Sequence, residues 1–99
     1  MNKVAIDGVI FKQEPLAYTP AGTAVTRFWL KHQSEEIEAG LPRKVMCEIE
    51  AIALGELAKK LGSIPQDTLV LLNGFLAAKN LKHPRLVLHV TDLVIDKNT

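Results

Sequence analysis

Residues 69–95 contain two strand-forming runs joined by a short basic segment, and this arrangement constrains the fold more than any other part of the sequence. The runs, residues 69–76 and 86–90, consist mainly of branched and large apolar side chains, which favour β-strands. The segment between them contains no acid and three fixed cations, at Lys79, Lys82 and Arg85. It predicts a strand pair with a cationic tip, which a small barrel can use to hold a nucleic-acid backbone. Lysines at such a tip can equally serve only to keep the strands soluble, so both interpretations remain open at this point.

The composition predicts one globular domain over residues 1–99. Of the 99 residues, 47% are hydrophobic and 23% are charged, which is ordinary for a folded domain. The formal net charge is only +1, so nucleic-acid binding would have to come from a local basic surface. The single cysteine, Cys47, excludes an internal disulfide and fits a cytoplasmic protein. We expect neither export nor membrane insertion, because the sequence shows no signal-peptide pattern and no long apolar stretch.

Three segments in the first half of the chain alternate between apolar and polar residues, as strands with one buried face do. They are residues 4–11, 24–32 and 43–53. In the second segment, Phe28 and Leu30 are assigned to the core face and Trp29 to the outer face. In the third segment we expect an inward face of Val45, Cys47, Ile49 and Ala51, and an outward face of Lys44, Met46, Glu48 and Glu50. The polar residues 33–42 are expected to form a loop.

The order of these elements predicts an all-β fold, a five-stranded OB-fold barrel with Greek-key topology. Residues 55–62 predict one short helix, because good helix formers lie between two glycines. This helix falls between the third and fourth strands, where an OB-fold has its helix. Gly8 and Gly74 lie inside the first and fourth strands, where a tightly coiled barrel needs bends. A β-sandwich is the main competing fold, but seven short strands do not fit this length comfortably.

Residue patterns typical of an enzyme or a metal site are absent from the sequence. The histidines His32, His83 and His89 are far apart, and neither C-x-x-C nor H-x-x-x-H spacing occurs. The glutamates of residues 35–38 are typical of a solvated surface. We therefore expect no catalytic activity, no metal and no cofactor.

The outer face of the second and third strands is the candidate binding surface, because OB-folds bind their ligands there. Trp29, the only tryptophan, lies on this face among cations, an arrangement that binds single strands by stacking and charge. Tryptophan is also common in subunit contacts, so a DNA-facing and a partner-facing Trp29 remain equal alternatives. The predicted nucleic-acid contacts are Arg27, Trp29, Lys31, Arg43, Lys44, Met46, Lys79, Lys82 and Arg85.

Several short motifs, in this order and spacing, resemble a known family. They are Gly8, the turn Thr19-Pro20-Ala21-Gly22, Phe28-x-Leu30-x-His32-x-Ser34, Glu36-x-Glu38-Ala39-Gly40, Arg43, Cys47, Gly74-Phe75, the basic segment and Val87-Leu88-His89. Over nearly its whole length the chain is similar to the primosomal replication protein N (PriB) family, which is related to single-stranded-DNA-binding proteins. The resemblance implies a homodimer of OB-folds that binds single-stranded DNA, the PriA helicase and other primosome components, and that helps to restart stalled replication forks.

The sequence departs from the family pattern between its second and third strands. Leu41 and Met46 stand where the best-known member has aromatic residues, and Gln33 stands where it has an arginine. Each lost stacking platform corresponds to roughly 1–3 kcal/mol of binding free energy. Two functions therefore remain open, a replication-restart accessory protein that binds single-stranded DNA and a protein-interaction OB module with little DNA binding of its own. A general single-strand coating protein is a weaker third option, because no long acidic-ended tail is evident.

Overall fold

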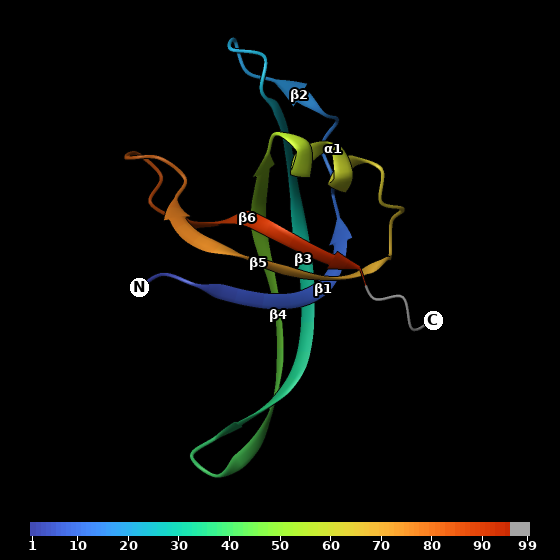
Figure 1. The fold of residues 1–99 in the computed structure, drawn as a ribbon. Coiled ribbons are helices and arrows are strands. Elements are labelled where there is room, and N and C mark those ends of the chain that lie inside the picture. Colours follow the sequence, from blue (N-terminus) through green and yellow to red (C-terminus); the bar gives the residue numbers. More distant parts are fainter. Residues whose placement is uncertain (96–99) are drawn as a thin grey trace.

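The computed structural model describes residues 1–95, and these residues form a closed β-barrel with one short helix (Figure 1). The elements are β1 Val4–Phe11, β2 Ala17–Tyr18, β3 Ala24–Glu38, β4 Leu41–Leu54, α1 Glu56–Gly62, β5 Leu69–Ala78 and β6 Leu86–Ile95. The strands follow the order β1-β5-β6-β4-β3-β2, and an additional β1–β3 pairing closes the barrel. The five long strands and the helix confirm the predicted OB-fold, and β2 is a two-residue strand paired with the start of β3.

The hydrophobic core fills the interior of the barrel and is completed at one end by α1. Phe28 and Leu30 of β3 are 1% and 0% exposed, which confirms the core face predicted for this strand. Leu61 of α1 is also fully buried, and the helix packs against β3 and β4. A helix of two turns is not stable alone in water, so α1 depends on this packing. Among the described residues, no helix is long and apolar enough to cross a membrane.

Gly8 allows β1 to change partners and so to close the barrel. The first part of β1 pairs with β5, whereas its last residues, from Val9 onward, pair with β3. At Gly8 the backbone of β1 passes so close to Lys31 of β3 that a β-carbon would collide with the Lys31 carbonyl. Gly74 of β5 lies equally close to the His89 backbone, next to an irregularity in the β5–β6 register. Both glycines therefore lie where another strand's backbone comes too close for a β-carbon.

The His32 side chain links β3 to β1 near the place where β1 changes partners. Its Nδ1 lies 2.7 Å from the Asp7 carbonyl oxygen, just where β1 leaves β3. Its Nε2 lies 2.8 Å from the Ser34 hydroxyl. The imidazole thus connects two neighbouring strands at the point where backbone pairing between them ends.

The expectation of a loop at residues 33–42 is wrong, because these residues extend the β3–β4 hairpin. Pairing continues to Glu38 opposite Leu41. Ala39 and Gly40 form a two-residue turn with φ values of 53° and 78°, and hairpin turns with positive φ at both positions match the twist of the strands. We call residues 33–46 the arm, because among the described residues they pair only with one another and project beyond the barrel (Figure 1). Both faces of residues 33–42 are largely exposed, so this part of the sequence lacks the apolar alternation that identifies a half-buried strand.

The inward orientation expected for Cys47 is also wrong, since its side chain is exposed. Cys47 does share a face of β4 with Ile49 and Ala51, as the alternation predicts. However, it lies opposite His32, where the arm begins and the core has ended. Alternation identifies the faces of a strand but not the point at which one face leaves the core.

The barrel closure predicts a strong effect of adding one methyl group at Gly8. We expect Gly8→Ala to lower the free energy of unfolding by about 2 kcal/mol, because the rigid Lys31 backbone must move. Gly62→Ala is the matched control, because nothing lies within 4 Å of the added carbon and its φ is not positive. Urea denaturation of both variants measures the difference, and equal stabilities would contradict the assigned role of Gly8.

Candidate nucleic-acid interface

The outer face of β3 presents the aromatic and cationic side chains that the sequence predicted. Arg27 and Lys31 are exposed and Trp29 is half-buried, whereas Phe28 and Leu30 between them point into the core. Alternation along one strand therefore places Trp29 between two cations on the outside of the barrel. An aromatic ring flanked by cations can stack on a base while the cations attract its phosphates.

The basic segment between β5 and β6, which we call the basic link (residues 79–85), is a defined loop. The Lys79 N–H donates to the Arg85 carbonyl at 2.9 Å, so these two residues lie together at the base of the loop. At the tip, the Asn80 side-chain oxygen accepts hydrogen bonds from the backbone N–H groups of Lys82 and His83, at 2.9 Å and 2.8 Å. Lys82 lies at the tip of the loop, between Lys79 and Arg85 in the sequence. The three predicted cations therefore occupy fixed backbone positions.

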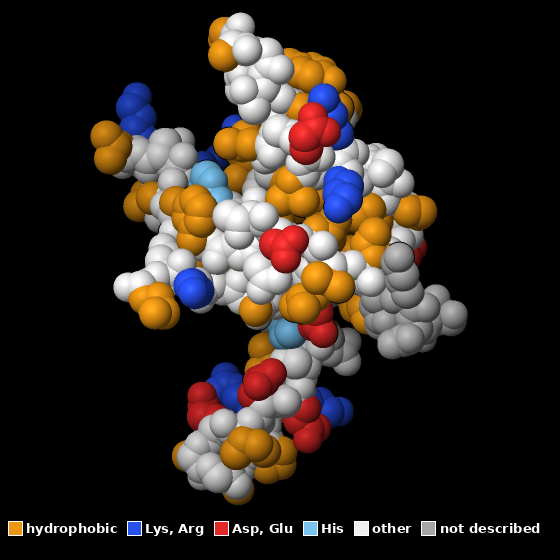
Figure 2. Space-filling model, in the orientation of Figure 1, with side chains coloured by type: hydrophobic (Ala, Val, Ile, Leu, Met, Phe, Trp, Pro, Cys, Tyr) orange, Lys and Arg blue, Asp and Glu red, His pale blue; other side chains and the backbone are white. Residues whose placement is uncertain are grey.

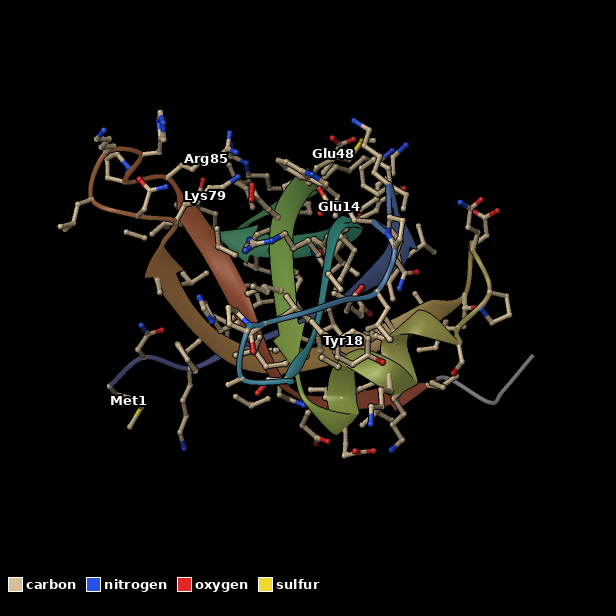
Figure 3. The ribbon with its side chains drawn as sticks, turned by 90° about the horizontal axis from the view of Figure 1, so that it is seen from above. Met1, Glu14, Tyr18, Glu48, Lys79 and Arg85 are labelled. Carbon is tan, nitrogen blue, oxygen red and sulfur yellow. The ribbon has the colours of Figure 1, made fainter. Side chains whose placement is uncertain are left out.

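Glu50 of β4 holds the base of the basic link against the outer face of the barrel. It lies directly opposite Trp29 in the β3–β4 register. Its two carboxylate oxygens lie 3.1 Å from Lys79 Nζ and 3.1 Å from Arg85 Nη2, and Figure 3 shows these two cationic side chains next to each other. Glu50 faces outward as the sequence predicted, yet it is only 8% exposed. Sequence reasoning missed this role, because the partners are far apart in the chain and no local pattern connects them.

A cavity of about 190 Å³ lies beside Trp29, and we call it the Trp29 cavity. Its lining combines residues from β3, β4, the basic link and the segment after β1: Lys12, Glu14, Arg27, Phe28, Trp29, Glu50, Lys79 and Arg85. The sequence did not identify Lys12 or Glu14. They approach the face because the Glu14 N–H donates to the Arg27 carbonyl at 2.8 Å, a tertiary contact that leaves no signal in the sequence. Four cations and two acids around a tryptophan can accommodate a base together with its phosphate.

The three remaining predicted contacts lie on the arm, away from the Trp29 cavity. Met46, which is 69% exposed, and Lys44 share the face of β4 that carries Glu50. Arg43 lies on the opposite face and is engaged by Glu38, with 2.7 Å between Nη1 and Oε1. Figure 2 shows the arm as a protrusion with an apolar tip and charges of both signs along its sides. The structure thus separates the predicted residues into a group on the barrel and a group on the arm.

The described residues contain no group of three or more His, Cys, Asp or Glu side chains that could hold a metal ion. Of the two acids that line the Trp29 cavity, Glu50 pairs with Lys79 and Arg85. The arrangement on this face is suited to binding an anionic polymer that carries aromatic bases.

Comparison with known proteins identifies the class to which this barrel and its outer face belong. The model of a family described as "another single-strand binding protein family" matches residues 2–92. The single-stranded DNA binding protein of Thermus aquaticus shares the fold, with a TM-score of 0.78 at 21% identity over 99% of this chain and 51% of that chain. The class is therefore that of the single-strand-binding barrels.

Other matches are more specific. The chain is 43% identical to the replication restart protein PriB of Nitrosomonas europaea, over 92% of this chain and 84% of that protein. It is 33% identical to PriB of Vibrio cholerae, over 89% of this chain and 91% of that protein. The structure of PriB from Ralstonia solanacearum superposes with a TM-score of 0.86 at 30% identity, covering 96% of this chain and 97% of that chain. The chain belongs to the PriB family, which confirms the resemblance found in the sequence.

Proposed function

We propose that this protein is a replication-restart accessory protein that binds single-stranded DNA and the PriA helicase. The observation that carries the proposal is the Trp29 cavity, where one tryptophan and four cations from separate segments meet on the outer face of the barrel. Membership of the PriB family supports the same function. In this proposal the protein acts in the cytoplasm by binding alone, with no catalytic group, metal or cofactor.

The proposed DNA path begins at the basic link, crosses Trp29 and continues toward the arm. Lys79, Lys82 and Arg85 contact phosphates at one end, and Arg27 and Lys31 follow along β3. Lys44 and Met46 extend the same face. Arg43 contributes least in this proposal, because it lies on the opposite face and pairs with Glu38.

A protein-interaction module with little DNA binding of its own is the second candidate, and the arm favours it. Ile37 and Leu41 are 70% and 68% exposed near the tip, and the arm contains no aromatic side chain on which a base could stack. Titration of a mixed-sequence single strand at physiological salt, with and without purified PriA, separates the two candidates. We expect binding without the helicase, whereas binding only in its presence would favour the interaction module.

Replacement of Trp29 tests whether the cavity binds DNA. Trp29→Ala should leave the barrel folded, because the ring lies outside the core, and should weaken single-strand binding by more than ~1 kcal/mol. Tyr18→Ala is the control, since Tyr18 is an aromatic side chain, 61% exposed, that lies on β2 outside the Trp29 cavity. Fluorescence anisotropy with a labelled oligonucleotide measures the affinities, and equal affinities of the two variants would argue against base stacking at Trp29.

The salt dependence of binding tests the phosphate contacts on β3. Each phosphate contact to a single strand contributes about 0.7 to the slope of log affinity against log salt concentration. Arg27→Ala combined with Lys31→Ala should therefore reduce this slope by about 1.4. The control combines Lys59→Ala with Lys60→Ala, which removes the same charge from α1. A reduction of equal size in both double variants would show that only overall charge matters.

We further propose that the protein is a C2 homodimer with the same surface of each copy in contact. The outer face of β5 and β6 carries four apolar side chains, between 38% and 50% exposed, at Leu69, Leu71, Phe75 and Val94. Exposed apolar surface of this kind favours association. Light scattering at micromolar concentration should give twice the chain mass of 10.9 kDa, and the mass of a single chain would contradict the proposal.

A further inference from the structure

Glu50 is the only charged residue in the described part of the chain that is buried, and it lies beneath the base of the basic link. Lys79 Nζ lies 3.1 Å from one of its oxygens and 3.4 Å from the other. Arg85 Nη2 lies 3.1 Å from that second oxygen. One carboxylate therefore holds both ends of the seven-residue link on the face that carries Trp29.

The two cations are held by Glu50 without losing their capacity to bind an anion. The Arg85 side chain is 60% exposed and that of Lys79 is 31% exposed. A guanidinium has five N–H donors and an ammonium has three. Glu50 engages only Nη2 of Arg85 and takes at most two of the three Lys79 donors, one for each carboxylate oxygen. The remaining donors of Arg85 and Lys79 are free to meet a phosphate from the solvent side.

The burial of Glu50 makes separation of this cluster unfavourable. A carboxylate with so little contact with water is stable only while it is paired with cations. A phosphate that drew both Lys79 and Arg85 away would leave the Glu50 carboxylate without a cationic partner. The favourable binding mode therefore keeps the cations on Glu50 and uses their outward donors.

We propose that Glu50 is a positioning residue for single-stranded DNA, which it does not touch. It fixes Lys79 and Arg85 beside Trp29 before DNA arrives, so that these long side chains lose less conformational freedom on binding. The inference rests on the proposed function, because it concerns how the same face binds DNA. The opposing possibility is that Glu50 only neutralises the two cations, in which case its removal would strengthen binding.

A comparison of Glu50→Gln with Glu48→Gln shows whether Glu50 positions Lys79 and Arg85 or only neutralises their charge. Glu48 lies two residues away on the same face of β4, is exposed, and forms no ion pair among the described residues. Both variants remove one negative charge from the same face of β4, so they share the general electrostatic effect. We expect Glu50→Gln to bind a mixed-sequence oligonucleotide about ten-fold more weakly than Glu48→Gln at the same salt concentration. Equal or tighter binding by Glu50→Gln would overturn the proposal.

A second measurement shows whether Glu50 acts through its two partners. In a protein that already carries Lys79→Ala and Arg85→Ala, the further change Glu50→Gln should weaken DNA binding no more than Glu48→Gln does in the same background, because the cations that Glu50 positions are gone. A ten-fold loss in that background would mean that Glu50 acts through the fold and not through the cations. Circular dichroism and urea denaturation establish that each variant is folded at the temperature of the binding measurement.

A third measurement needs no DNA and therefore remains informative if the proposed function fails. Trp29 is the only tryptophan, and it lines the same cavity as Glu50, Lys79 and Arg85. Acrylamide should quench its fluorescence to different extents in Glu50→Gln and Glu48→Gln, because Lys79 and Arg85 line the cavity beside the ring and lose their anchor only in Glu50→Gln. Absence of DNA binding by the unsubstituted protein would defeat the proposed function alone, whereas equal quenching in the two variants would defeat the positioning role.

Discussion

The close approach of β1 to β3 at Gly8 is the constraint on which the rest of the structure depends. A β-carbon at this position would collide with the Lys31 carbonyl, so only glycine lets β1 leave β5 and pair with β3. That pairing closes the barrel and places Phe28 and Leu30 in its core. Because successive side chains of a strand face opposite sides, the same closure turns Trp29 and its flanking cations outward. The binding face is thus a direct consequence of how the barrel closes.

Ion pairs then hold the basic link against the outer face of the barrel, beside Trp29. The cations of the basic link belong to a connection between β5 and β6, yet Glu50 of β4 holds them beside Trp29 of β3. A backbone hydrogen bond from Glu14 to Arg27 brings the segment after β1 to the same place. The surface therefore draws on residues from four parts of the chain. This convergence supports the proposed binding of single-stranded DNA on the barrel, even though Leu41 and Met46 leave the arm without aromatic side chains.

Local patterns in the sequence predict the strands and the helix that bury one face. Features that depend on contacts between distant segments leave no such pattern. The alternation around Phe28 predicts its strand correctly, because burial of one face leaves a periodic signal. The helix near Leu61 is predicted correctly because good helix formers lie between two glycines. Residues 33–42 of the arm are missed as strand because both of their faces are largely exposed, whereas residues 43–46 belong to a correctly predicted strand. The sequence assigns Cys47 inward because alternation carries no information about where a core ends. Lys12, Glu14 and the ion pairs of Glu50 connect distant segments, so a reading of one sequence had no means to find them.

The central claim is that single-stranded DNA binds on the barrel face between the basic link and β3. Amide chemical-shift mapping by NMR, with a mixed-sequence oligonucleotide titrated into the protein, tests this claim most directly. The largest shifts should fall on residues 27–31 and on the basic link, with smaller shifts along the arm. Shifts confined to the arm, or no shifts at saturating oligonucleotide, would contradict it.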